Sequence, residues 1–181
     1  MKFTIIGAYA SPNRAIGCKN CLPWSNKVDM VYFRTTTSYC PDEGSMNAII
    51  MGRNTFESLG RKPLPNRVNV VLTSSPETYR KESNMYPELI FTNSSLTETL
   101  ETLDNIPYIH CCFVIGGESL YKQAITHPNC ERILVNEIKL LNPILNADTW
   151  FPEISTDMYQ LIDMRRLSDT VTNYEYIRIN I

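Results

Sequence analysis

Asp29 is the residue whose type and spacing most directly suggest chemistry. Residues 27–39 are predicted to form a helix that begins after Ser25 or Asn26. In that helix Asp29 lies one turn before Phe33 on the same stripe. If the stripe faces the core, burial raises the pKa of the carboxyl, and such groups are usually functional or tightly paired. If the helix is rotated, Asp29 only caps or solvates the first turn, where the helix dipole favours an acid. The spacing leaves both interpretations open.

Two glycine turns could hold an anionic group such as a dinucleotide pyrophosphate. Gly116-Gly117 comes where a buried strand gives way to a helix, so its backbone can approach a ligand while the following amides face an anion. Gly52-Arg53-Asn54-Thr55 also follows a buried strand, and it adds a guanidinium and a hydroxyl. Either turn could instead be a plain bend. No GxGxxG fingerprint is present, which disfavours an ordinary Rossmann domain.

Three other features each have a chemical and a structural interpretation. Arg67, soon after Leu64-Pro65-Asn66, is either a surface charge on a strand or a bidentate clamp for a substrate carboxylate. Leu22-Pro23-Trp24, taken alone, is typical of a packed loop anchor. Cys18 and Cys21 have the spacing of a metal or redox pair, but no second pair completes a zinc site. We therefore expect ordinary thiols among the six cysteines.

The elements that must position these residues alternate between strands and helices. A polar loop is predicted between the strands at 67–73 and 89–92, and Gly60 is predicted to end a short helix in a left-handed conformation. The alternation predicts a single α/β domain over residues 1–181, with a central, mostly parallel sheet flanked by helices and finished by antiparallel strands. Strands are predicted at 3–10, 48–51, 67–73, 89–92, 111–115, 132–138, 159–164 and 174–181, and helices at 27–39, 53–59, 95–104 and 118–125.

Composition excludes several classes of protein. The chain has 181 residues, which suits one domain, and 17 basic and 19 acidic residues leave a formal net charge of −2. That charge gives no field strong enough to gather nucleic acid or anionic lipid. The apolar runs are too short to cross a bilayer, and Met1-Lys2-Phe3 leads into a strand without a cleavable leader. We expect a soluble, cytoplasmic protein that takes a small-molecule substrate.

A series of short motifs spans nearly the whole chain, and each is modest on its own. The motifs are Ile16-Gly17, Leu22-Pro23-Trp24, Asp29 with Phe33, Ile50-Met51-Gly52-Arg53 with Thr55, Leu64-Pro65 with Arg67, Ile115-Gly116-Gly117 with Tyr121, and Asp148-Thr149 with Phe151-Pro152. Their order and their gaps resemble those of the dihydrofolate reductase family.

The resemblance implies an NADPH-dependent reduction of 7,8-dihydrofolate to 5,6,7,8-tetrahydrofolate on a sheet of about eight strands. Asp29 would hold the 2-amino group and N3 of the pteridine and promote protonation of N5 before hydride reaches C6. The segment from Ile16 to Trp24 would be the loop that closes over the reacting centre. Leu22 and Trp24 in this loop are the other implied catalytic residues.

The resemblance also implies contacts with the substrate. Phe33 would stack near the pterin and the benzoyl ring, which Leu59 and Leu64 would flank. Arg67 would pair with the α-carboxylate of the glutamate. The remaining implied substrate-binding residues are Asn136 and Ile115.

The implied cofactor site draws on several strand ends. Ala8 and Ile16 would hold the nicotinamide carboxamide, and Arg53 and Thr73, with Ser74 adjacent, would contact the 2′-phosphate. No metal is implied. The other implied cofactor-binding residues are Gly17, Gly52, Asn54, Thr55, Ile115, Gly116, Gly117, Glu118, Ser119 and Tyr121.

The chain departs from the family pattern in three places. Asn136 stands where the family usually has Thr, Phe56 stands where Trp is frequent, and residues 38–47 resemble an insertion relative to shorter bacterial members. An amide can also donate to Asp29 and accept from water, so we expect the hydrogen-bond network to persist in altered form.

Two alternatives to this function remain open from the sequence. One is the related NADPH-dependent pyrimidine reductase of riboflavin synthesis, against which the spacing from Trp24 to Asp29 and the presence of Arg67 argue. The other is a homologue that binds a nucleotide or folate without turnover. The sequence also leaves open whether the chain is joined to thymidylate synthase, as in some relatives. If it works alone, we expect a monomer.

Overall fold

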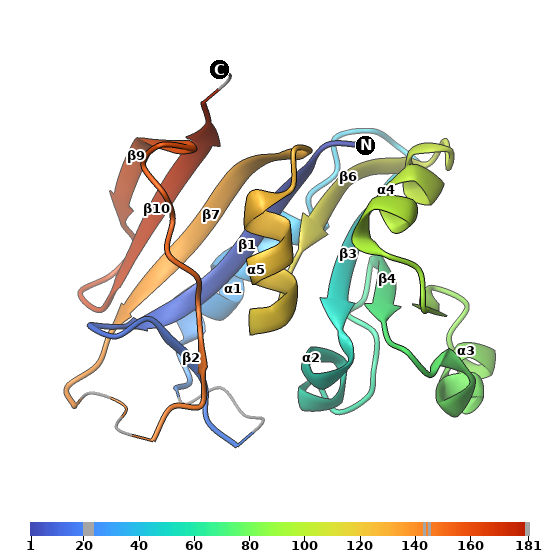
Figure 1. The fold of residues 1–181 in the computed structure, drawn as a ribbon, viewed down its shortest axis with the longest axis horizontal. Coiled ribbons are helices and arrows are strands. Elements are labelled where there is room, and N and C mark those ends of the chain that lie inside the picture. The colour runs from blue at the N-terminus through green and yellow to red at the C-terminus, as the bar shows by residue number, and fades with distance from the viewer. Residues whose placement is uncertain (20–23, 143, 145, 180–181) are drawn as a thin grey trace.

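The central sheet is mostly parallel, as the alternation of strands and helices predicts. The computed structural model describes residues 1–19, 24–142, 144 and 146–179. Neighbours from β5 to β7 run parallel, whereas β10 pairs antiparallel with both β7 and β9. This arrangement confirms the predicted fold class. Within the described residues, eight strands lie side by side in the sheet in the order β5 (Leu89–Thr92), β4 (Arg67–Leu72), β3 (Met46–Gly52), β6 (Ile109–Val114), β1 (Phe3–Ser11), β7 (Cys130–Lys139), β10 (Val171–Arg178) and β9 (Tyr159–Arg166) (Figure 1).

Helices cover both faces of this sheet. In Figure 1, α4 (Leu96–Asp104) and α5 (Glu118–Thr126) lie in front of the sheet, and α1 (Lys27–Ser38) lies behind it. Because neighbouring side chains of a strand point to opposite faces, Ile5 of β1 packs in the core beneath α5, while Ile6 packs in the core beneath α1. The sheet therefore separates two cores. The remaining helical segments are α2 (Arg53–Ser58), the short 3-10 helix η1 (Pro76–Tyr79) and α3 (Arg80–Met85).

Local sequence accounts for where several helices begin and end. The Ser95 hydroxyl accepts a hydrogen bond from the Glu98 amide at 3.2 Å, and the Glu98 carboxylate accepts one from the Ser95 amide at 2.8 Å, so α4 begins with the predicted capping box. Gly60 follows α2 with φ of 73°, the left-handed conformation predicted for it.

The predicted polar loop between β4 and β5 is wrong in part, because it contains η1 and α3. These short segments are polar and lack a capping side chain, so no amphipathic pattern marks them. Tertiary contacts hold them instead: the Tyr79 ring stacks on Phe91 with centroids 4.5 Å apart, and its hydroxyl donates to Glu57 at 2.7 Å.

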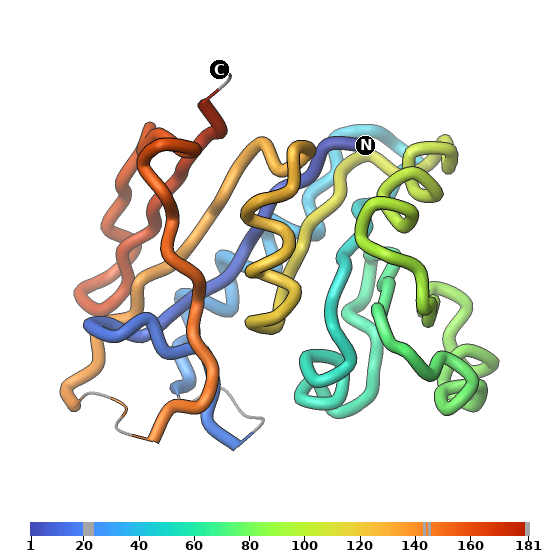
Figure 2. Tube along the Cα trace, in the orientation of Figure 1, coloured from blue at the N-terminus to red at the C-terminus, as the bar shows by residue number. Residues whose placement is uncertain are grey.

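Two short strands were also not predicted. β2 (Ala15–Gly17) pairs with β1 and with β8 (Thr149–Trp150), and both strands are too short to show an alternating pattern. The last strand begins at Val171, earlier than predicted, and residues 180–181 of the predicted range lie outside the described residues. Figure 2 shows the segment between β8 and β9 running along the sheet on the α5 side, where Phe151 joins the core.

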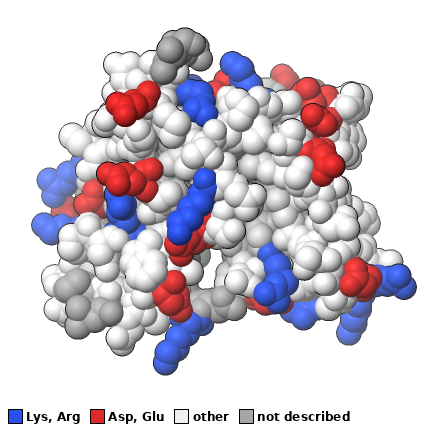
Figure 3. Space-filling model, in the orientation of Figure 1, with Lys and Arg blue, Asp and Glu red and all other residues white. Residues whose placement is uncertain are grey.

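Surface charge agrees with the near-neutral composition. On the face drawn in Figure 3, basic and acidic side chains are intermingled, without a broad patch of one sign. Among the described residues, no helix has the length and apolar character needed to span a membrane.

Candidate active site

The start of α1 is fixed by Asn26. Its side-chain oxygen accepts hydrogen bonds from the amides of Val28 at 3.0 Å and Asp29 at 3.2 Å, which makes Asn26 the N-cap. The Asn26 amide nitrogen donates to the Thr170 hydroxyl at 3.3 Å, in the connection between β9 and β10. The helix therefore cannot rotate freely, and the direction in which Asp29 points is set.

Asp29 faces the sheet and is half-buried, as the first interpretation of its spacing requires. Its Oδ1 accepts a hydrogen bond of 2.8 Å from the amide nitrogen of Asn136 on β7. Burial raises the pKa of the carboxyl above its ordinary value, and the hydrogen bond from Asn136 offsets part of that rise. No charged side chain is among the causes of the shift. Asp29 is thus an acid held by neutral donors.

The loop before α1 supplies a second neutral group. The Trp24 indole lies close enough to Asp29 to lower the pKa of the carboxyl, although its buried Nε1 makes no hydrogen bond of full geometry with the described residues. The predicted catalytic residue Leu22 lies outside the described residues, as does Cys21.

Apolar side chains extend from Asp29 along the α1 face of the sheet. Phe33 and Leu64 are half-buried and pack against the core beneath α1, to which the buried Ile115 belongs. Leu59 follows α2 and is 37% exposed, so its side chain is available to a ligand. These placements agree with an apolar wall between the acid and the far end of α1.

Arg67 is a buried cation without a carboxylate partner. The residue is 2% exposed, and its guanidinium donates to the Thr37 hydroxyl at 2.7 Å and to the Pro65 carbonyl at 3.0 Å. Among the described residues, no Asp or Glu oxygen lies within 4.0 Å of it. Burial and the neighbouring charge of Arg34 lower its pKa, yet a guanidinium stays protonated in proteins. Its surroundings therefore suit a ligand carboxylate and exclude a simple surface charge.

Three polar residues that the sequence did not single out hold Arg67 in place. The Thr37 hydroxyl also donates to the Phe33 carbonyl at 2.8 Å, and the Asn47 amide donates to the Thr37 carbonyl at 3.0 Å. The Asn69 side chain bonds both the amide and the carbonyl of Leu64, at 2.8 and 2.9 Å. No sequence pattern marks these residues for this role, because the partners through which they act lie on other elements or on the preceding loop.

The two glycine turns lie against each other in the structure. The Gly52 amide donates to the Gly116 carbonyl at 2.8 Å, and a Cβ at Gly117 would lie 3.3 Å from the Thr55 hydroxyl. Gly52 and Gly117 are the N-caps of α2 and α5, and neither has a capping side chain. The first-turn amides of both helices therefore lack the side-chain acceptor that α1 and α4 have, and an anion would supply it.

Other predicted cofactor residues surround these turns. Arg53 is exposed and is the first residue of α2, followed by Asn54. Its Nη1 lies 3.9 Å from Oε1 of Glu57. Thr73 and Ser74 follow β4 at the same edge of the sheet as Arg53, since β3 and β4 are parallel. Ser119 is exposed in the first turn of α5.

Tyr121 supports the turn from inside the core. Its hydroxyl donates to the carbonyls of Ile6 at 3.0 Å and Ile115 at 2.8 Å, and its ring lies 2.8 Å from where a Cβ of Gly116 would be. Gly116 has φ of 111°, which an L side chain rarely adopts. Tyr121 therefore shapes the turn from inside the core, and its contact with a cofactor stays a prediction.

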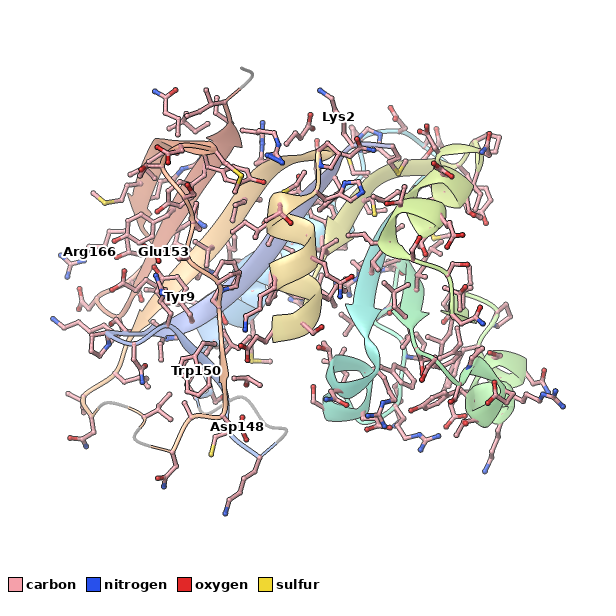
Figure 4. The ribbon with its side chains drawn as sticks, in the orientation of Figure 1. Lys2, Tyr9, Asp148, Trp150, Glu153 and Arg166 are labelled. Carbon is pink, nitrogen blue, oxygen red and sulfur yellow. The ribbon has the colours of Figure 1, made fainter. Side chains whose placement is uncertain are left out.

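The segment that carries Ile16 and Gly17 is tied down at its base. β2 pairs with β8, and the Asp148 carboxylate accepts a hydrogen bond of 2.7 Å from the Lys19 amide. Figure 4 shows Asp148 and Trp150 close together at this edge. The Trp150 amide donates to Glu118 at 3.1 Å, so the first turn of α5 is linked to the same base.

A hollow of about 740 Å³ lies away from Asp29. It is lined by Tyr9, Ser11, Pro12, Asn13, Arg14 and Glu137. Tyr9, labelled in Figure 4, packs against Phe151 on the α5 side of the sheet. Ala8 and Asn136 are cross-strand partners, and their side chains point to the opposite, α1 side. The sheet separates this hollow from the candidate acid.

Comparison with known proteins agrees with the geometry. A family model described as dihydrofolate reductase matches residues 2–181. The chain belongs to the dihydrofolate reductase family. It is 36% identical over 169 residues to the dihydrofolate reductase of Heliothis virescens, covering 92% of this chain and 88% of that protein. It is 36% identical over 166 residues to the dihydrofolate reductase of Aedes albopictus, covering 89% of this chain and 84% of that protein.

Some relatives are longer. The chain is 34% identical over 156 residues to the bifunctional dihydrofolate reductase-thymidylate synthase 2 of Arabidopsis thaliana, covering 83% of this chain and 26% of that protein. Membership of the dihydrofolate reductase family confirms the family predicted from the motifs. Asn136 donates to Asp29 through its amide nitrogen, as expected for an amide at this position.

Proposed function

We propose that the chain reduces 7,8-dihydrofolate to 5,6,7,8-tetrahydrofolate with NADPH. The observation that carries the proposal is Asp29, a half-buried carboxyl whose described partners are neutral donors. Such an acid is costly to keep unless a ligand uses it. In a member of the dihydrofolate reductase family, the ligand that needs an anion there is the pteridine ring.

Asp29 would act by its charge and by its two oxygens. Asn136 holds Oδ1, so the carboxylate keeps a defined orientation toward the 2-amino group and N3 of the pteridine. A carboxylate in a setting of low dielectric stabilises a protonated ring nitrogen, here N5, which makes C6 a better acceptor. The chemistry that NADPH supplies when bound is the hydride for C6. Asp29 need not transfer the proton itself.

The other end of the substrate would meet Arg67. Its guanidinium is pre-oriented by Thr37 and Pro65, and it has no described carboxylate partner to displace. Pairing with the α-carboxylate of the glutamate would satisfy this buried charge. Phe33, Leu59 and Leu64 lie along the path between the two ends and would cover the benzoyl group.

The glycine turns fit a dinucleotide phosphate. The uncapped first turns of α2 and α5 offer backbone amides to the pyrophosphate, and the small residues Gly52 and Gly117 let it approach. Arg53, Thr73 and Ser74 would bind the 2′-phosphate, and the backbone of Ala8 and Ile16 would hold the nicotinamide. The segment that contains Trp24 would exclude water when closed.

A direct assay tests this function. We expect the absorbance of NADPH to fall when both protein and dihydrofolate are present, and to stay constant when either is omitted. Binding of NADPH without turnover would contradict the proposed reduction and leave a nucleotide-binding homologue.

Cofactor preference tests the phosphate site separately. Arg53→Gln should raise the KM for NADPH and leave the KM for NADH nearly unchanged, because only NADPH carries the 2′-phosphate. Arg80→Gln, which removes an exposed arginine from α3, is the matched control and should change neither value.

A further inference from the structure

A second asparagine stands directly behind Asn136. Asn173 of β10 is the cross-strand partner of Asn136 in the antiparallel pair of β7 and β10. The two residues are 2% and 1% exposed. The Asn173 amide nitrogen donates to Oδ1 of Asn136 at 2.9 Å, and the Asn136 amide nitrogen donates to Oδ1 of Asp29 at 2.8 Å. The two hydrogen bonds therefore run in one direction and end on the acid.

The direction matters because an asparagine amide has two chemically opposite ends of nearly the same shape. With its nitrogen toward Asp29, Asn136 stabilises the carboxylate. Turned by half a rotation, it would present its oxygen to the carboxylate and repel the ionised form. Asn136 alone has no preference fixed by shape, so a neighbour must set its orientation.

We propose that Asn173 is a positioning residue for the reduction, which sets the amide of Asn136 so that its donor end meets Asp29. The effect of Asn173 on turnover rests on the proposed function, whereas its effect on the titration of Asp29 does not. The Asn173 amide nitrogen donates to the oxygen of Asn136. If Asn136 were reversed, its own amide nitrogen would face that of Asn173, and two donors would oppose each other.

The chemistry of an amide explains why such a residue is needed here. A threonine hydroxyl donates and accepts through one atom and can rotate to suit its neighbours. The amide of Asn136 divides the two roles between two atoms at fixed positions. An asparagine at that place therefore requires a second group behind it, and Asn173 is the buried side chain that supplies it.

No charged group near Asp29, Asn136 and Asn173 is among the causes of the Asp29 pKa shift, so Asn173 acts on Asp29 mainly through the two hydrogen bonds. Tyr121 lies across the sheet from Asp29. Burial, with a smaller contribution from the charge of Asp29, raises the pKa of its phenol so far that the phenol stays neutral. At the other end, the Asn173 amide lies beside Tyr32, and Glu175 is paired with Arg132 at 3.1 Å and Arg165 at 3.5 Å. Glu175 and Arg165 act on Tyr32, and none of these three charges is among the causes that shift the pKa of Asp29.

The test is the titration of the Asp29 carboxyl, followed by carbon-13 NMR in the protein without ligands, together with the pH profile of kcat/KM. Asn173→Leu removes the donor, and Asn173→Asp, of nearly the same shape, replaces it with an acceptor that favours the reversed Asn136. We expect the pKa of Asp29 to rise in both variants, and more in Asn173→Asp. We expect kcat/KM at neutral pH to fall roughly tenfold, within the range of interaction energies between contacting residues.

Two controls separate positioning from stability. Val171→Ala removes buried apolar contact from the same strand and should lower the melting temperature without moving the Asp29 titration. In an Asn136→Leu background, which has no amide to orient, Asn173→Leu should cause no further shift.

Two results would overturn the proposal. One is an unchanged Asp29 titration in folded Asn173→Leu and Asn173→Asp. The other is a shift that persists in the Asn136→Leu background. Because the titration needs no substrate, it can fail while turnover stands, and turnover can fail while the titration shift stands.

Discussion

The two ends of α1 each present a charge that the fold has withdrawn from water. At the first turn the charge is the Asp29 carboxylate, which accepts from the amide of Asn136. At the last turn it is the Arg67 guanidinium, which donates to the hydroxyl of Thr37. Burial is the largest cause of the pKa shift at both, upward for Asp29 and downward for Arg67.

The difference lies in how each group can respond to that burial. A carboxyl can take a proton, so Asp29 can relieve its cost by titrating as the pH falls. A guanidinium keeps its charge, so Arg67 can be relieved only by an anion. One end of the helix is therefore suited to proton chemistry and the other to permanent anchoring.

The helix between them sets the length of the ligand. From Asp29 to Thr37 the chain rises about 12 Å at 1.5 Å per residue. A substrate with a protonatable ring at one end and a carboxylate at the other would reach both groups along this face. The comparison predicts that changes at the two ends affect different parts of the reaction.

The largest expected effect is that of Asp29→Asn. We expect the rate of reduction at pH 7 to fall at least about a hundredfold, the lower range of contributions from positioned acids and bases. The deficit should shrink in acid, where the substrate arrives protonated. Asp157→Asn, which makes the same change at an exposed position, should leave the pH profile as it is. Equal activity of Asp29→Asn and the parent would remove Asp29 from the mechanism.

Arg67→Leu comes next and should act on binding. We expect the Kd for dihydrofolate to rise roughly 10- to 100-fold, the worth of a hydrogen-bonded charge pair. Binding of NADPH should stay nearly unchanged, and so should binding of a dihydropterin that lacks the glutamate. Isothermal titration with each ligand measures the three values. A loss confined to NADPH would show that the clamp is misassigned.

Thr37→Val should give a smaller change of the same kind. The hydroxyl orients Arg67 without touching the ligand in our assignment, so its loss frees the guanidinium rather than removing it. We expect the KM for dihydrofolate to rise roughly three- to tenfold with kcat little changed, since one net hydrogen bond is worth about 1 kcal/mol. A fall in kcat without a change in KM would place Thr37 in the chemistry instead.

The sequence carried the parts of this site that depend on local pattern. The start of α1 at Ser25 or Asn26, the stripe that joins Asp29 to Phe33, and the glycine turns after β3 and β6 all follow from neighbours within a few positions. The family motifs then indicated Arg67 and the cofactor positions. The roles of those residues stay predictions, while the fold class and the family are confirmed.

The parts that escaped prediction depend on strand register and tertiary packing. Asn173 meets Asn136 only because β10 pairs with β7 in one register, and a shift of one residue would send it to the other face. Thr37 meets Arg67 only because the last turn of α1 lies beside the start of β4. Short polar helices such as α3 have no apolar stripe that a sequence pattern could reveal.

The smallest expected effect concerns stability and separates the two ends most directly. Because the pKa of Asp29 is raised in the folded protein, the folded state binds a proton more tightly than the unfolded chain. The free energy of unfolding should therefore decline as the pH rises from the unfolded value, near 3.8, through the folded one. Asp29→Asn should lack this decline and gain stability at neutral pH, by less than roughly 2 kcal/mol, as when a costly functional residue is replaced.

Urea unfolding of the parent and Asp29→Asn across this pH range measures that gain. The two proteins should converge below pH 3.8, where the parent carboxyl is protonated in both states. Arg67→Leu should show no such pH-dependent difference from the parent, since its charge does not change over the range. A gain for Asp29→Asn that grew as the pH fell would mean that the fold stabilises the carboxylate, and the contrast between the two ends of α1 would then be lost.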